Sequence, residues 1–155
     1  MACEFINGDG VVFCVWGTPT KNDMDQILQN LRTSAAKVSG PAVYVARVPS
    51  DAPAPDARAR AHLNALMPEI APLFQSCHIV LEGDGFMAAM KRGVLVSLFQ
   101  IGKRRSIYYV HSNVNDILPK ISPDRLPAAR SVLRRAQSSG LLSCPPPVSR
   151  VPRSA

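Results

Sequence analysis

Apolar and polar positions alternate along the chain in a pattern that predicts strands and helices in turn. Residues 3–17 contain two β-rich runs, CEFI and VVFCVWG, separated by Asn7-Gly8-Asp9-Gly10. Asparagine, aspartate and glycine tolerate the positive φ that tight hairpin turns need. The pattern therefore predicts a β-hairpin whose second strand is apolar on both faces, as a central strand is.

The next segment has the spacing of an amphipathic helix. Its apolar positions recur at i, i+3, i+4, i+7 and i+11: Met24, Ile27, Leu28, Leu31 and Ala35. We expect Asn22 to cap this helix, because asparagine can accept the backbone N–H groups that the first turn leaves unpaired. Gly40-Pro41 is expected to end it, before a strand at residues 42–48.

The second half of the chain continues the alternation. A proline-rich loop at residues 49–55 leads to a helix that begins at Asp56 and is expected to be kinked or two-part, because Pro68 and Pro72 interrupt it. After it the sequence predicts a strand, a helix, a strand and a short helix, at residues 78–82, 86–101, 106–112 and 114–121.

This order, β-β-α-β-α-β-α-β-α, predicts a single α/β domain. Alternation of this kind gives a mixed, mostly parallel sheet, here of about five strands, with helices packed on it. We expect the domain to span residues 1–121. A basic tail at residues 122–155 is expected to hold a short helix over 123–137 and then a disordered, proline-containing end.

Charge is unevenly distributed between these two parts. The 155-residue chain has 18 Lys and Arg against 11 Asp and Glu, a net charge of +7. Six of the arginines and one acid, Asp124, lie in residues 122–155, a net of +5, which leaves 12 bases and 10 acids, a net of +2, for residues 1–121. We expect solvated surface charge rather than specific nucleic-acid binding, because such domains place their bases on a folded face among aromatic residues.

Other composition features exclude some classes of protein. No apolar run reaches the roughly 18–20 residues of a membrane-spanning helix, and the first residues lack the pattern of a signal peptide, so we expect a cytoplasmic protein. The four cysteines are scattered, without Cys-x-x-Cys or Cys/His metal-ligand spacing, and are expected to be reduced structural thiols: Cys3, Cys14, Cys77 and Cys144.

Four segments carry a resemblance to a known family. They are VVFCVWGTPTKNDMDQILQNLRTSAAK, AVYVARV, HIVLEGDGFMAAMKRG and SIYYVHSNVNDILPKI. In order and element type they resemble the strands and helices of the STAS domain, the fold of anti-sigma-factor antagonists, over about residues 3–121. The resemblance implies a regulatory module that works through protein–protein contacts.

The likeness departs from the family at its working site. STAS antagonists carry a phosphorylatable Ser or Thr in a D-S-[ST]-G turn at the start of the second helix. Here the stretch reads PSDAPAPDARARA, in which the only hydroxyl is that of Ser50, and no Ser or Thr follows Asp56 at the helix start. A phospho-switch is therefore not carried over.

We accordingly expect a non-enzymatic regulatory or scaffolding module that binds a protein partner, with no cofactor and no metal. Strand-to-helix loops of such a fold collect at one end of the sheet, which places the loop at residues 49–58 beside the turn that starts at Glu82. The expected partner-binding residues are Ser50, Asp51, Asp56, Arg58, Glu82 and Asp84. A homodimer is a further option.

Two other classes stay open. Gly83 and Gly85, between a strand and a helix, could offer backbone N–H groups to a small molecule or nucleotide, although a plain tight turn explains them better. An enzyme of unrecognised type would need a polar pocket with residues such as Glu82, Asp84 and His111. Cys77 and His78 are neighbours that point to opposite faces of a strand, so they do not form a nucleophile–base pair.

The basic helix at residues 123–137 has its own alternatives. It could lie on an anionic membrane or dock into a groove of a partner, but it has few large apolar residues. We favour a helix that packs on the edge of the domain or frays in solution. A nucleic-acid role for the tail would show as steeply salt-dependent binding.

Overall fold

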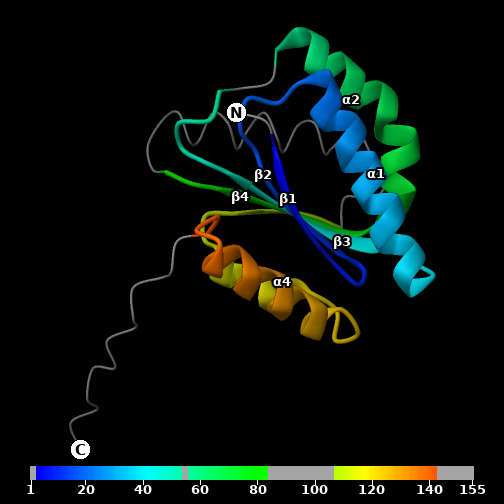
Figure 1. Cartoon of the computed structure of the whole chain (residues 1–155), viewed down its shortest axis with the longest axis vertical. Helices are drawn as coiled ribbons and strands as arrows, with labels where there is room; N and C mark the ends of the chain where they lie inside the picture. Colours follow the sequence, from blue (N-terminus) through cyan, green and yellow to red (C-terminus); the bar gives the residue numbers. More distant parts are fainter. Residues whose placement is uncertain (1–2, 54–55, 84–106, 143–155) are drawn as a thin grey trace, which may run out of the picture.

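A computed structural model describes residues 3–53, 56–83 and 107–142 of the chain. Over these residues the protein is one α/β domain with a five-stranded sheet in the order β1-β2-β3-β4-β5 (Figure 1). The predicted fold class, a mostly parallel five-stranded sheet with helices packed on it, is confirmed. The expected helix at residues 86–101 lies outside the described residues.

The sheet begins with the predicted hairpin. β1 (Glu4–Gly8) pairs antiparallel with β2 (Val11–Val15), and Gly8 faces Val11 across a turn made by Asp9 and Gly10. Gly10 has a φ of 72°, a left-handed conformation that glycine adopts without steric cost. The turn chemistry of the sequence therefore sets the register of the hairpin.

The other strand pairs are parallel. β2 pairs with β3 (Ala42–Val48), β3 with β4 (Phe74–Leu81) and β4 with β5 (Tyr108–His111). β4 begins four residues before the predicted strand at residues 78–82, and β5 is shorter than the predicted strand at residues 106–112. The order of strands along the sheet follows their order along the chain.

Helix α1 (Lys21–Val38) begins two residues earlier than the expected cap at Asn22 would place it. Its cap is Thr20, not Asn22: the Thr20 hydroxyl accepts the N–H of Asp23, and the Asp23 carboxylate accepts the N–H of Thr20 at 2.7 Å. This reciprocal arrangement is a capping box. Thr20 therefore takes the cap position that the sequence predicted for Asn22.

Helix α2 (Ala57–Ile70) begins at the predicted place. The Asp56 carboxylate caps it by accepting the N–H of Ala59 at 2.7 Å. The helix contains Pro68 and is followed by a 3-10 helix, η1 (Ala71–Leu73), which agrees with the expected two-part helix.

The chain after β5 forms two 3-10 helices, η3 (Val114–Asp116) and η4 (Leu118–Lys120), where the sequence predicted one short helix. Helix α4 (Leu126–Ser138) follows. Its buried residues repeat at helical spacing: Ala129, Val132, Leu133 and Ala136. Three of the four are 1% exposed or less, so α4 is a core helix.

Two hydrophobic clusters lie on the two faces of the sheet. Helices α1 and α2 cover one face, and α4 covers the other (Figure 1). Residues of β2 and β3 alternate between the clusters: Val12 and Tyr44 belong to the first, Phe13 and Val45 to the second. The central strands are therefore covered on both sides, as their apolar sequences predicted.

This packing changes the expected domain boundary. Ile121, α4 and Leu142 share one buried cluster with β1, β2 and β3. The folded unit thus continues past residue 121 to at least residue 142, and α4 neither frays nor forms an appendage. No helix among the described residues is long and apolar enough to cross a membrane.

Candidate functional site

The structure brings part of the predicted partner surface together. The chain after β3 turns at Pro49, whose carbonyl accepts the N–H of Ala52 at 3.1 Å. This turn places the exposed Ser50 against Gly83, where a β-carbon on the glycine would lie 3.0 Å from the Ser50 Cβ. Ser50, Asp51 and the turn after β4 therefore do share one end of the sheet.

Glu82 has a structural partner at this end. Its carboxylate accepts two hydrogen bonds from the Arg47 guanidinium, at 2.6 and 2.8 Å. Arg47 also donates to the carbonyl oxygen of Leu141 at 3.1 Å. Bidentate pairing of this kind is strong and directional, so Glu82 serves to tie β3, β4 and the segment after α4 together.

Of the other predicted residues, one has a structural role like that of Glu82 and one is exposed at the surface. Asp56 is the cap of α2, whereas Arg58 is exposed on the first turn of that helix. Asp84, and Gly85 of the alternative phosphate-binding turn, lie outside the described residues. Asp51 and Arg58 are therefore better probes of this surface than Asp56 or Glu82, because within the described residues their side chains close no helix cap or inter-strand ion pair.

A second polar group lies inside the sheet. Nδ1 of His78 on β4 is 3.0 Å from Nε2 of His111 on β5, and Nε2 of His78 is 2.9 Å from the Ser76 hydroxyl. The rings of His78, Tyr109 and His111 are stacked. His111 on the last strand therefore contacts the neighbouring strand β4 through His78.

The environment of the two histidines keeps them neutral. Burial, followed by the nearby His111, lowers the pKa of His78 to about 4. Burial also lowers the pKa of His111, while Asp116 acts in the opposite direction. His78 is fully buried, so this pair is a hydrogen-bonded part of the core rather than an accessible acid or base.

Cys77 lies on the opposite face of the sheet from His78, as the alternation predicted. It belongs to the cluster under α1 and α2, and burial raises the pKa of its thiol. His62, the remaining histidine, is hydrogen-bonded to Asp25 at 2.7 Å on the surface. The described part of the chain holds no group of three or more His, Cys, Asp or Glu side chains placed to bind a metal ion.

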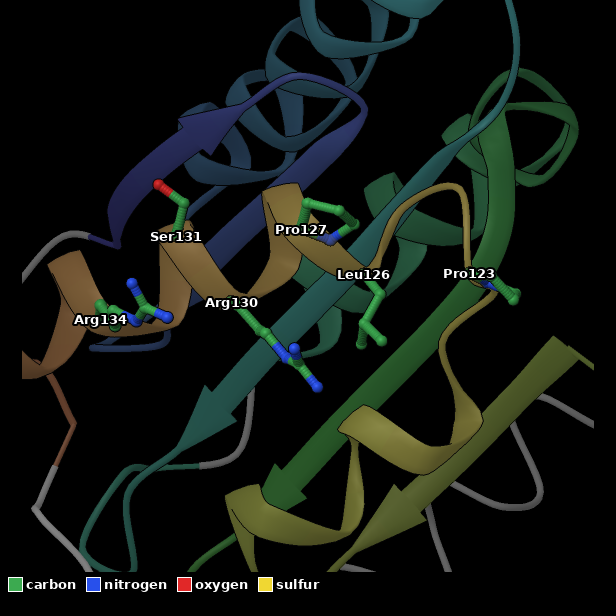
Figure 2. Close-up of a pocket in the computed structure, with 6 residues that line it drawn as sticks. All are labelled: Pro123, Leu126, Pro127, Arg130, Ser131 and Arg134. Carbon is green, nitrogen blue, oxygen red and sulfur yellow. The ribbon is translucent and has the colours of Figure 1, made fainter.

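Two hollows of the described surface lie along α4. The first has a volume of about 350 Å³ and is lined by Pro123, Leu126, Pro127, Arg130, Ser131 and Arg134 (Figure 2). The second, of about 250 Å³, is lined by Val114, Asn115, Leu118, Arg130, Leu133, Arg134 and Gln137. Both hollows contain Arg130 and Arg134, and only the second reaches the 3-10 helices, through Val114, Asn115 and Leu118. We call the two hollows together the α4 groove.

Helical spacing puts the cations of the α4 groove in line. Leu126, Arg130 and Arg134 are four residues apart and so lie on one side of the helix. In Figure 2 the side chains of Leu126 and Arg130 project from the same side of α4. The groove therefore combines apolar contact area with two guanidinium groups at a fixed spacing.

These two arginines differ from their neighbours. Arg125 binds Asp124 and the carbonyl of Pro41, and Arg135 donates to the carbonyl of Asn7. Arg130 and Arg134 are exposed, and no carboxylate from residues 3–53, 56–83 or 107–142 forms an ion pair with either. They are therefore available to an anionic partner.

Comparison with protein-family models, with curated proteins and with solved structures finds no match to this chain.

Sequence reasoning identified the basic helix but not its groove. The repeat of Leu126, Arg130 and Arg134 at four-residue intervals was the available signal. It could not show that the opposite side of the helix is buried on the sheet, nor that η3 and η4 lie close enough to complete a groove. Those contacts join segments that are distant in the sequence.

Proposed function

We propose that this protein is a non-enzymatic regulatory or scaffolding module that binds a protein partner through the α4 groove. The occupant is an acidic segment of that partner, with carboxylates and apolar side chains on one face. The observation that carries this proposal is the pair Arg130 and Arg134, exposed beside apolar groove walls and without carboxylate partners in the described structure.

Charge complementarity selects the occupant. A guanidinium pairs with a carboxylate through two parallel hydrogen bonds, and side chains four residues apart on a helix can meet two such carboxylates. Leu118, Leu126 and Leu133 supply the apolar contact that an amphipathic segment buries in a groove. The sequence of residues 143–155 has two arginines and no acid, so charge disfavours this segment as the occupant.

The STAS resemblance supports the same class of function. A hairpin followed by strands in sequential parallel order is compatible with that fold. On this proposal regulation does not pass through the family's phosphorylated position, because Asp56 stands at the helix start and Ser50 is the only hydroxyl in the preceding loop.

Charge reversal tests the proposal directly. The full chain, a R130E/R134E variant and a K37E/R60E control, which changes net charge equally on α1 and α2, are used to capture proteins from native lysate. Each of the three chains is then titrated with a labelled synthetic peptide that carries leucine and glutamate at helical spacing. We expect R130E/R134E to weaken peptide binding about tenfold or more, and the control to retain it.

Two further samples distinguish other binding modes. Anionic vesicles or single-stranded DNA that bind more tightly than the peptide would overturn the assignment of a protein partner. A D51A/R58A variant tests the loop at residues 49–58, which remains a separate proposal. If that variant loses the captured partner while R130E/R134E keeps it, the interface lies at the loop and not in the α4 groove.

A further inference from the structure

Two buried cysteines meet at the open end of the hairpin. Cys3 directly precedes β1, and Cys14 lies on β2 opposite Phe5. Because side chains alternate along a strand, Cys3 and Phe5 share the face on which Cys14 lies. Both thiols belong to the cluster under α1 and α2, and each acts on the pKa of the other.

The two thiols have different surroundings. The backbone of Gly17 contributes to lowering the pKa of the Cys3 thiol, and the Cys3 N–H donates to the Asp23 carboxylate at 3.1 Å. Tyr44, whose hydroxyl accepts the Trp16 Nε1–H at 3.3 Å, acts on the pKa of the Cys14 thiol.

These surroundings assign different chemical roles. The hydrogen bond from Cys14 lowers the pKa of Cys3, whereas burial raises the pKa of Cys14 well above its ordinary value. Cys3 is 8% exposed and Cys14 is fully buried. Thiolate character and access together make Cys3 the first of the pair to react with a small oxidant.

We propose that Cys3 and Cys14 form a redox-active dithiol that a hydroperoxide converts to a disulfide. The Cys3 sulfur attacks one oxygen of the peroxide, the O–O bond breaks, and the released oxygen takes a proton and leaves as water or an alcohol. Cys3 is then a sulfenic acid. The Cys14 sulfur attacks it, the S–O bond breaks, and hydroxide leaves as water with the Cys14 proton.

Two electrons pass from the two thiols to the peroxide, which completes the balance. Formation of the bond moves the end of the hairpin rather than a central strand, because Cys3 lies before the β1–β2 ladder. Residue 3 is also joined to the capping box of α1 through Asp23. The disulfide would therefore fix the start of the chain against β2 and the first turn of α1.

Mass spectrometry of the full chain tests this pairing. Cys3 and Cys14 lie in one tryptic peptide, residues 1–21, and cleavage before Asp9 separates them. After brief treatment with hydrogen peroxide we expect this peptide to lose two hydrogens and its halves to stay linked. Cys77, buried on another strand, is the internal control. We expect it to react with the peroxide at least about tenfold more slowly than Cys3.

Single variants test the order of the steps. In a Cys14→Ser or Cys14→Ala chain, Cys3 should accumulate as a sulfenic acid that dimedone traps. In a Cys3→Ser chain, Cys14 should stay reduced. Circular dichroism checks that each variant folds. The proposal is overturned if Cys14 reacts as fast without Cys3, if Cys77 reacts as fast as Cys3, or if the wild-type peptide halves are not linked.

Discussion

Many polar side chains of this domain close backbone hydrogen bonds where strands and helices begin. The buried Asp23 carboxylate accepts N–H groups of Thr20 and Cys3, and the Ser34 hydroxyl donates to the carbonyl of Gly8 at the hairpin. Buried polar groups that are paired in this way cost little, whereas loss of one partner leaves the other unsatisfied. At the residue scale, such caps connect the helices to the sheet.

Asp56→Ala tests whether this residue is a cap or a partner contact. Loss of an N-cap side chain costs about 1 kcal/mol, so we expect the unfolding free energy to fall by that amount. Arg58→Ala, two residues along and exposed, should leave it within about 0.5 kcal/mol of wild type. Urea unfolding followed by circular dichroism measures both. Equal losses in the two variants would contradict the cap assignment.

The buried histidine pair predicts a pH dependence. In the unfolded chain histidine titrates near pH 6.5, whereas burial lowers the pKa of His78 to about 4 and also lowers that of His111. Between these values the unfolded chain binds more protons, so stability is full above about pH 6.5 and falls as pH falls towards 4. Between about pH 6.5 and pH 4, the titration of His78 alone lowers the unfolding free energy by about 3 kcal/mol.

Urea unfolding at pH 7, 6 and 5 measures this slope. His62→Asn, which leaves the buried pair intact, should keep it, and His111→Asn should reduce it. A wild-type unfolding free energy that stays constant from pH 7 to 5 would contradict the burial of the pair.

Sequence predicted part of this residue-scale chemistry. Alternation along a strand correctly separated Cys77 from His78, because it depends only on local geometry. The pairing of Glu82 with Arg47 was not predicted, and Glu82 was expected to face a partner. Ion pairs of this kind depend on strand register across 35 residues of sequence, which composition does not contain.

Among the elements, α4 differs most from its sequence-based interpretation. Its arginines suggested an appendage, yet Val132 is 1% exposed and packs against β1 and β2, where a β-carbon on Gly8 would lie 2.6 Å from Cγ2 of Val132. An amphipathic helix with one basic side and one small apolar side can be either a surface helix or a core helix. Here α4 is a core helix because it covers the apolar face of the sheet that α1 and α2 leave open, which includes Ile6, Val11 and Phe13 of the hairpin.

Val132→Ala tests the packing of α4. Removal of two buried methyl groups should lower the unfolding free energy by about 2 kcal/mol. Ser131→Ala, exposed on the same turn, should change it by less than about 0.5 kcal/mol. Thermal unfolding of both variants provides the measurement. A Val132→Ala chain as stable as wild type would place α4 outside the core.

Strand boundaries show where polar residues concealed an element. β4 starts at Phe74, four residues before the predicted strand, in a stretch where Gln75 and Ser76 interrupt the apolar pattern. In the structure Gln75 accepts a hydrogen bond from Ser122, and Ser76 is bonded to His78. These partners come from tertiary structure, so periodicity alone could not extend the strand.

At the scale of the whole molecule, the sheet needs cover on both faces. Phe13 and Val45 would be exposed without α4, since they share its cluster. A chain that ends at residue 121 should therefore lose the cooperative unfolding transition of the full chain and bind the dye ANS. The R130E/R134E full chain, in which α4 is present, is the control and should keep the transition. A cooperative fragment 1–121 would restore the earlier domain boundary.

The central claim is that the α4 groove binds an acidic partner segment, and its most direct test is a titration followed by NMR. The full ¹⁵N-labelled chain is mixed with the leucine–glutamate peptide at low and high salt. We expect the largest amide shifts at residues 114–118 and 126–137, with binding that weakens as salt screens Arg130 and Arg134. Shifts confined to residues 49–58, or saturable binding that R130E/R134E leaves unchanged, would contradict the account.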